Sequence, residues 1–215
     1  MKSDNIIVRN PKHISRLDLD IIERVLVTLL LGLLASRLIP AAIAPVSFSN
    51  IILLVSEGVV VVFVAFRRRT TAISHRSFDW FVGFAGTLCP LLVIPATNSP
   101  VIPIAYCASL MFTGFAIQLW AKLTLRRSFG LVAANRGVKV TGPYQLVRHP
   151  MYAGYILTHV GFLLSGPSLW NLAIYSLTFS LLVARILAEE RILSHDPAYW
   201  AMARNVRWRV IPLLF

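Results

Sequence analysis

The sequence is poor in acidic side chains and in charge of either sign. Asp and Glu number 9 against 21 Lys and Arg, and charged residues make up 14% of the 215 residues, whereas a soluble domain carries roughly 25%. Hydrophobic residues make up 57% and gather in runs of membrane-spanning length. This composition favours an integral membrane protein over a soluble domain. The basic excess is then expected to set orientation and contact lipid headgroups, and it does not indicate a nucleic-acid partner.

Several familiar site motifs are missing. The sequence has no GxGxxG, P-loop, CxxC pair or GxSxG nucleophile elbow, which excludes the soluble nucleotide-binding folds. Its two cysteines, Cys89 and Cys107, lie in apolar runs. Neither their spacing nor their neighbours indicate a metal site, and a disulfide inside a membrane is not expected. The polar N-terminal stretch does not resemble a signal peptide.

The apolar runs predict an all-α polytopic membrane protein with about six transmembrane helices. Their connections alternate between uncharged and basic, so we expect both termini and every basic loop of this multi-pass cell-membrane protein to be cytoplasmic. The fifth run is too short for a perpendicular span, and Gly166-Pro167 predicts a tight turn after it. Runs five and six are therefore expected to form a C-terminal helical hairpin that opens toward the cytoplasm. The predicted segments are residues 21–44, 51–66, 78–96, 101–123, 152–164 and 168–188.

Three isolated polar residues fall within or beside these runs. Glu57 lies in the second segment, where a carboxylate is a functional candidate or a partner for a neighbouring helix. His159 is more typical of a hydrogen-bonded core residue than of a ligand, and Arg37 is typical of a side chain that snorkels to the interface. The residues suited to chemistry are concentrated after Arg126, so the first hundred residues have the character of a scaffold.

A first polar cluster, GPYQLVRHPMYAGY, occupies residues 142–155. Pro150 suits the first turn of a helix, where its missing N–H is of no consequence. Arg148 and His149 then lie at the mouth of that helix, whose free N–H groups and dipole favour an anion, and Tyr152 follows within one turn. An interfacial belt would have a similar composition, so both interpretations stay open at this point.

A second cluster, ARILAEERIL, closes the last apolar run at residues 184–193. Arg185 and Glu189 are four apart and share one helix face, whereas Glu190 points about 100° away. A snorkelling arginine beside a solvated acidic end is the alternative. If the hairpin closes, His149 and Glu189 are expected at the same membrane depth, facing one cavity.

Together, the GPY-x3-RHP-x-Y-x-G run, the following EERIL and the arginine-rich tail that ends near a proline resemble the isoprenylcysteine carboxyl methyltransferase family. These are integral-membrane enzymes that use S-adenosylmethionine (SAM), and phospholipid methyltransferases share parts of the pattern. The resemblance covers residues 126–215, the expected methyltransferase core, and leaves residues 1–125 as an N-terminal cytoplasmic segment and membrane scaffold.

The resemblance also implies site residues. Arg185 matches the position that holds the carboxylate substrate, and it is the expected catalytic residue. The tail is shorter than in eukaryotic members, so the resemblance does not show what covers the cofactor. The cofactor-binding residues that it implies are Arg136, Gly137, Val138, Lys139, Tyr144, His149, Pro150, Met151, Tyr152 and Glu189.

The chemistry agrees with this assignment. Methyl transfer from a sulfonium to a carboxylate neutralises two charges, which exclusion of water favours. The carboxylate is ionised near pH 7 and needs no base, so the protein has mainly to position the reactants. The expected acceptor is a lipophile or lipidated peptide, such as an isoprenylcysteine-type C-terminus, that enters from the membrane lipid. A phospholipid amine is the open alternative for the acceptor.

Two other functions compete with methyl transfer. Membrane sterol reductases, which use NADPH, share an RHP-x-Y-x-G run but usually continue it with an acid, where this chain has Tyr155. A non-enzymatic transporter or scaffold would carry polar residues through several helices, and Glu57 alone hints at that.

Overall fold

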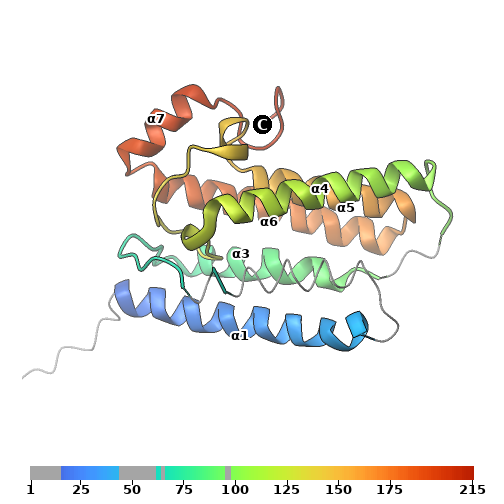
Figure 1. The fold of residues 1–215 in the computed structure, drawn as a ribbon, viewed down its shortest axis with the longest axis horizontal. Coiled ribbons are helices and arrows are strands. Elements are labelled where there is room, and N and C mark those ends of the chain that lie inside the picture. The colour runs from blue at the N-terminus through green and yellow to red at the C-terminus, as the bar shows by residue number, and fades with distance from the viewer. Residues whose placement is uncertain (1–15, 44–61, 64–65, 95–97) are drawn as a thin grey trace, which may run out of the picture.

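The computed structural model describes residues 16–43, 62–63, 66–94 and 98–215, and the regular elements of this part of the chain are all helices joined by loops. Within these ranges, five helices run side by side along the long axis, and a sixth, short one lies at one end (Figure 1). A single antiparallel bridge joins Ile73 to Ala134 within the described residues. The helices are α1 (Arg16–Ile43), α3 (Ser77–Leu88), α4 (Ile104–Leu125), α5 (Pro150–Ser165), α6 (Leu169–Leu193) and α7 (Pro197–Asn205).

The predicted apolar segments correspond to helices wherever the structure describes them. The first, third, fourth, fifth and sixth become α1, α3, α4, α5 and α6. The third ends earlier than expected, since α3 stops at Leu88 and a 3-10 turn, η1 (Cys89–Leu92), follows. Pro90 explains this stop, because proline lacks an N–H and its ring clashes with the preceding turn.

Membrane-crossing length is shown for two helices. Within the described residues, Ile104–Ser128 and Leu169–Leu193 are long and apolar enough to cross a membrane, and Ser77–Leu92 is a shorter apolar stretch. Most of the second predicted segment, including Glu57, lies outside the described residues, as does the side chain of Arg37. The number of six spans therefore stays a prediction.

Helix α5 packs most extensively against α4, which lies on the side of α5 that faces away from α6. A Cβ placed on Gly154 would lie 2.5 Å from the carbonyl oxygen of Gly114, and one on Gly161 would lie 2.9 Å from that of Cys107. Glycine at these positions lets the two backbones approach closely, as in small-residue helix interfaces of membrane proteins. The expected hairpin of α5 and α6 does form, and α4 packs against the opposite side of α5.

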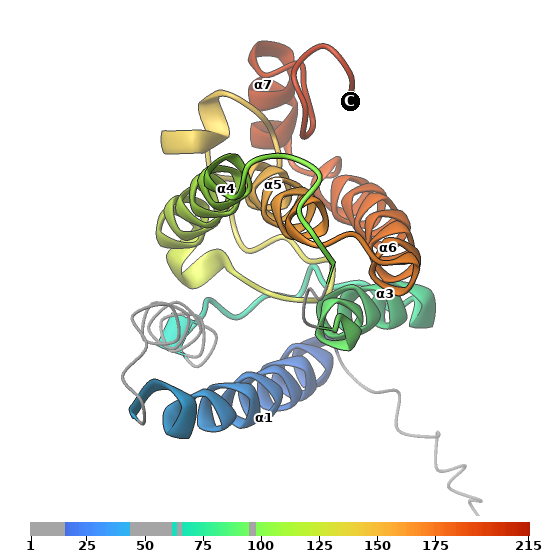
Figure 2. The same cartoon turned by 90° about the vertical axis from the view of Figure 1, so that its right-hand side faces the viewer.

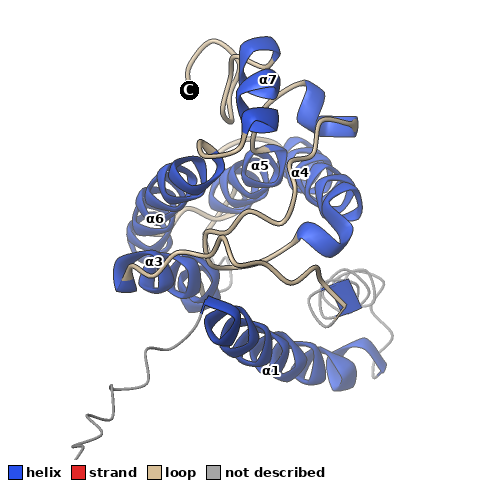
Figure 3. Cartoon of the chain, turned by 90° about the vertical axis from the view of Figure 1, so that its left-hand side faces the viewer, coloured by secondary structure: helices blue, strands red, loops and turns tan. Residues whose placement is uncertain are grey.

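Viewed along the helices, α5 lies between α4 and α6, and α3 lies beside α6 (Figure 2). Helix α1 stands apart from α4 and α5, with the loops of residues 67–76 and 126–141 between them (Figure 3). Among the described residues, the largest buried cluster gathers side chains from α1, α4, α5, α6 and the loop of residues 126–141, Val27, Leu131, Tyr152 and Ile186 among them. That loop is thus part of the core at this end of the bundle.

Candidate active site

A cavity opens at the end of the bundle where α4 ends, α5 begins and α6 ends. Its empty volume is about 760 Å³, the open mouth included. The loop between α4 and α5 forms most of its wall. The lining residues are Leu125, Ser128, Phe129, Gly130, Val132, Ala134, Arg136, Gly137, Val138, Lys139, Tyr144, Arg148, His149, Met151, Tyr152, Glu189, Leu193 and Met202.

The residues predicted to bind the cofactor gather on this wall, with one exception. Residues 136–139, Tyr144, His149, Met151, Tyr152 and Glu189 all line the cavity. Pro150 is not among the lining residues; it is buried at the first position of α5, where it starts the helix. Arg148, which sequence analysis placed at the mouth of the helix but not among the cofactor-binding residues, also lines the cavity. Sequence analysis did not predict the apolar wall or Met202.

His149 and Glu189 meet, as the hairpin predicts. The imidazole Nδ1 lies 3.6 Å from Glu189 Oε2, and the ring stacks on that of Tyr152 with centroids 5.7 Å apart. The main-chain N–H of His149 donates to the carbonyl of Arg209 at 2.8 Å. The C-terminal tail therefore fixes the residue that begins α5, and the two polar clusters face one cavity.

Arg185 lies one helical turn before Glu189 and is buried. Its Nε donates to Glu189 Oε1 at 3.3 Å, and its Nη2 donates to the carbonyl of Gly130 at 3.1 Å. Its guanidinium carbon lies 5.4 Å from the ring centre of Tyr152, whose hydroxyl donates to the same Glu189 oxygen. Arg185 is absent from the described cavity lining, but it contacts Gly130, Tyr152 and Glu189, which all belong to it.

Glu190 has a different task from Glu189. Arg148 Nη1 donates to its Oε1 at 2.9 Å, and Arg209 Nε donates to its Oε2 at 2.7 Å. His149 Nε2 lies 3.4 Å from Oε1. The adjacent acids are thus divided between a carboxylate on the cavity wall and one that ties the tail to α5 and α6. Sequence analysis separated their directions but gave Glu190 no role.

Helix α7 lies beside the cavity, where sequence analysis did not identify the segment that covers the cofactor. Tyr199, Met202 and Val206 form a buried cluster with Val138 and Leu193, and Met202 reaches the cavity. Burial is the main cause that raises the pKa of Tyr199 to about 12. The short tail therefore packs beside the cavity through an apolar face, from which Met202 reaches the wall.

Tyr144, in the 3-10 turn η3 (Gly142–Gln145), places a neutral phenol on the wall. Burial, followed by the charge of Glu189, holds the pKa of Tyr144 well above its usual value of 10. Gly142 has φ 60°, a conformation that glycine adopts without strain. This turn lets Tyr144 fold back toward the cavity.

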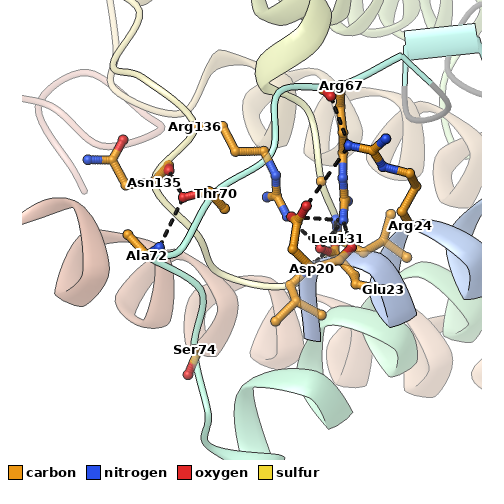
Figure 4. Close-up of polar contacts among 12 residues, drawn as sticks. Asp20, Glu23, Arg24, Arg67, Thr70, Ala72, Ser74, Leu131, Asn135 and Arg136 are labelled. Atoms are coloured by element: carbon orange, nitrogen blue, oxygen red, sulfur yellow. Dashed lines mark hydrogen bonds and ion pairs between the residues drawn. The ribbon is translucent and has the colours of Figure 1, made fainter. Parts of the chain in front are cut away.

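A buried group of charges behind the wall escaped sequence analysis. Arg136 Nη2 lies 2.9 Å from Asp20 Oδ1 and 2.5 Å from Glu23 Oε2, both on α1. Arg67 Nη2 contacts the same acids at 3.1 and 2.8 Å (Figure 4). The available signal was the pair of acids three residues apart at the start of an apolar run. Their partners lie far away in sequence, so the pattern alone gave no reason to connect them.

Comparison with known proteins identifies the central part of the chain. Residues 102–196 match the family model of phospholipid methyltransferase. The matched part is just under half of the chain, and it is similar to phospholipid methyltransferases. No curated protein matches the chain. The match takes in α4, ahead of the core boundary predicted at residue 126, and runs through α5 and α6 to Glu189 and beyond.

Phospholipid methyltransferases use S-adenosylmethionine. The match therefore indicates a membrane methyltransferase with S-adenosylmethionine as its cofactor. That finding favours methyl transfer over NADPH-dependent reduction and over a non-enzymatic role. The cavity suits the cofactor by the chemistry of its wall. Glu189 is a carboxylate for hydroxyl or ammonium donors, while Met151, Phe129 and Leu125 provide apolar surface for a purine.

Proposed function

We propose that the protein transfers the methyl group of SAM to the carboxylate of a lipophilic acceptor, of the kind found at an isoprenylcysteine C-terminus. The observation that carries this proposal is the buried Arg185, which Gly130 and Glu189 hold beside the cavity. A planar guanidinium can bind a carboxylate through two parallel hydrogen bonds. Bound SAM supplies a methyl group on a sulfonium, and transfer to a carboxylate neutralises both charges.

The wall residues divide the remaining work. Glu189 accepts hydrogen bonds from donor groups of the cofactor, and His149 orients that carboxylate from 3.6 Å. The rings of Tyr144 and Tyr152 favour a nearby cation through their π-faces. Residues 136–139 contribute main-chain and side-chain contacts from the loop. Met202 and the rest of α7 exclude water, which strengthens the electrostatic interactions inside the cavity.

The acceptor is proposed to enter sideways from the bilayer. On α6, Val183 and Leu187 are 42% and 50% exposed, so the face of this helix opposite the buried Arg185 is apolar and suited to lipid contact. We place the cavity and both termini on the cytoplasmic side of the cell membrane, in agreement with the basic loops.

A phospholipid amine is the second candidate acceptor, because the family model that matches is that of phospholipid methyltransferases. An ammonium group must lose a proton before it can accept a methyl group. The His149–Glu189 pair on the wall offers a place for that proton. The two acceptors thus predict different pH dependences: turnover that rises with pH for an amine, and turnover that is nearly flat above pH 6 for a carboxylate.

Calorimetric titration of the detergent-solubilised protein with S-adenosylhomocysteine tests the cofactor site. Saturable binding by the wild type, weakened at least ~10-fold in Glu189→Ala, is expected, since a hydrogen bond to a charged group contributes about 1.5–3 kcal/mol. Absence of binding by folded wild type would contradict the proposal. Transfer of labelled methyl to an S-farnesylcysteine analogue and to phosphatidylethanolamine vesicles then identifies the acceptor. Labelling of the vesicles alone would replace the carboxylate by the amine.

A further inference from the structure

Four buried charges connect α1 to the cavity wall. We name Asp20, Glu23, Arg67 and Arg136 the acid–arginine cluster; its side chains are at most 2% exposed. The two acids balance the two arginines. Burial of such groups is unfavourable unless each charge has partners. The cluster is therefore a specific arrangement and not an incidental surface network.

Glu23 makes contacts that reach beyond the arginines. Its Oε1 accepts hydrogen bonds from the main-chain N–H groups of Leu131 and Val132, at 2.8 and 2.9 Å. Its Oε2 contacts Arg136 Nη2 at 2.5 Å. One carboxylate from α1 therefore fixes both the main chain of the wall and an arginine that lines the cavity (Figure 4).

Gly130 joins this cluster to the proposed acceptor site. Its carbonyl accepts the hydrogen bond from Arg185 Nη2 at 3.1 Å. On its other side, a methyl group at Gly130 would overlap Arg136 Nη1 and would come within 3.2 Å of Glu23 Oε1. The contacts run without a break from α1 through the wall to Arg185.

The loop of residues 67–76 supports the same wall from outside. The main-chain N–H of Arg68 donates to the carbonyl of Arg127 at 2.8 Å, and that of Asn135 donates to Ala72 at 2.8 Å. These bonds join the main chain of residues 67–76 directly to the main chain of the wall, so they attach the loop independently of the acid–arginine cluster. The contacts of the cluster can therefore serve to orient wall side chains as well as to attach the loop.

From these contacts we propose that Glu23, assisted by Asp20, is a positioning residue of the methyltransferase site. Glu23 sets the main chain at residues 130–132, so that the Gly130 carbonyl orients Arg185 and Arg136 lies along the cavity. The inference rests on the proposed function for the role of Arg185 and the cavity. It assigns to α1, outside the matched domain, a part in building the active site.

The test compares two double variants that carry the same charge. Both contain Arg67→Gln, which removes one arginine; the first adds Glu23→Gln and the second adds Glu23→Met. Each leaves Asp20 paired with Arg136, which lie 2.9 Å apart in the wild type. Glutamine keeps an oxygen for the Leu131 and Val132 N–H groups, and methionine of similar length does not. No residue of the proposed cofactor or acceptor site is changed.

S-Adenosylhomocysteine affinity and hydrogen exchange of the peptide covering residues 128–136 are measured on both variants and the wild type. We expect the glutamine variant to bind within about threefold of wild type, since the hydrogen bonds persist, and the methionine variant at least ~10-fold more weakly. Exchange of the wall peptide should be faster in the methionine variant alone. Equal affinity and equal exchange in the two variants would overturn the inference.

Exchange needs no ligand, so it separates this inference from the proposed function. If wild type bound no S-adenosylhomocysteine, the proposed function would fail while the exchange difference would still decide the role of Glu23. If a double variant did not fold, Gly130→Ala provides the second test, because its methyl group displaces Arg136 with the acids intact. It should weaken binding at least ~10-fold; wild-type affinity in folded Gly130→Ala would overturn the inference.

Discussion

Arg185 and Glu189 form an ion pair along one face of α6, with Arg185 Nε 3.3 Å from Glu189 Oε1. The pair joins the group proposed to hold the acceptor to the group proposed to hold the cofactor. Tyr152 completes it, since its hydroxyl donates to Glu189 and its ring lies under the guanidinium. Substitution of either member should therefore separate the two binding functions.

Arg185→Ala should reduce turnover by at least ~10–100-fold while S-adenosylhomocysteine affinity stays within about threefold, because the lost charged hydrogen bonds serve the acceptor. Arg185→Lys should recover turnover only in part, since an ammonium cannot bind a carboxylate through two parallel bonds. Calorimetry and methyl-transfer rates provide the two measurements. Arg204→Ala, at an exposed arginine of α7, is the control. Loss of cofactor binding in a folded Arg185→Ala protein would show that the proposed roles are wrong.

Glu189→Gln and Glu190→Gln should affect different properties, the first cofactor binding and the second stability. Glu189→Gln should weaken S-adenosylhomocysteine binding at least ~10-fold with a small change in Tm. Glu190→Gln should lower the free energy of unfolding by about 1.5–3 kcal/mol, because Arg148 and Arg209 lose a charged acceptor. Thermal unfolding beside calorimetric titration distinguishes them. The same profile for both variants would argue against the division between adjacent acids.

The glycine contacts between α4 and α5 predict a loss of stability on Gly154→Ala. The new methyl group would lie 2.5 Å from the Gly114 carbonyl oxygen, and overpacking of this kind destabilises a protein by about 1–3 kcal/mol. Gly32→Ala in α1 is the matched control, since a Cβ there meets nothing within 4 Å. Detergent-phase thermal unfolding measures both. Equal Tm values would mean that the α4–α5 interface is looser than described.

Asp196 predicts a pH-dependent contribution to stability. It caps α7 by accepting from the Ala198 N–H at 2.9 Å, and its other oxygen accepts from Asn135 Nδ2 at 2.7 Å. The hydrogen bond from Asn135, followed by that from Ala198, holds the pKa of Asp196 below its usual value of 3.8. Because the folded pKa is depressed, the stabilisation is present above pH 3.8 and is lost as the pH falls through the folded pKa.

Asp196→Ala should therefore lower the free energy of unfolding by about 1 kcal/mol at neutral pH, the typical contribution of a helix N-cap. The difference from wild type should shrink below pH 3.8. Unfolding by denaturant at pH 7 and at pH 3 provides the comparison. A constant difference across this range would indicate that ionisation of Asp196 is not involved.

Much of the fold and part of the site follow from local sequence. Apolar runs predicted α4, α5 and α6, and Gly166-Pro167 predicted the turn between the last two. The four-residue spacing placed Arg185 and Glu189 on one helix face. Tight packing between α5 and α4 was not predicted, because the glycines that permit it are separated by a long loop and carry no periodic signal of their own.

The sequence by itself determined the positions of α1, α3, α4, α5 and α6 and the residue types gathered near residues 142–155 and 184–193, because backbone geometry relates local spacing to a helix face. The tertiary structure decided which of these groups meet. Glu23 reaches Arg136 across 113 positions of the chain, and Glu190 turns to the tail while Glu189 lines the cavity. Such contacts depend on how loops fold over the end of the bundle, and local periodicity does not specify that path.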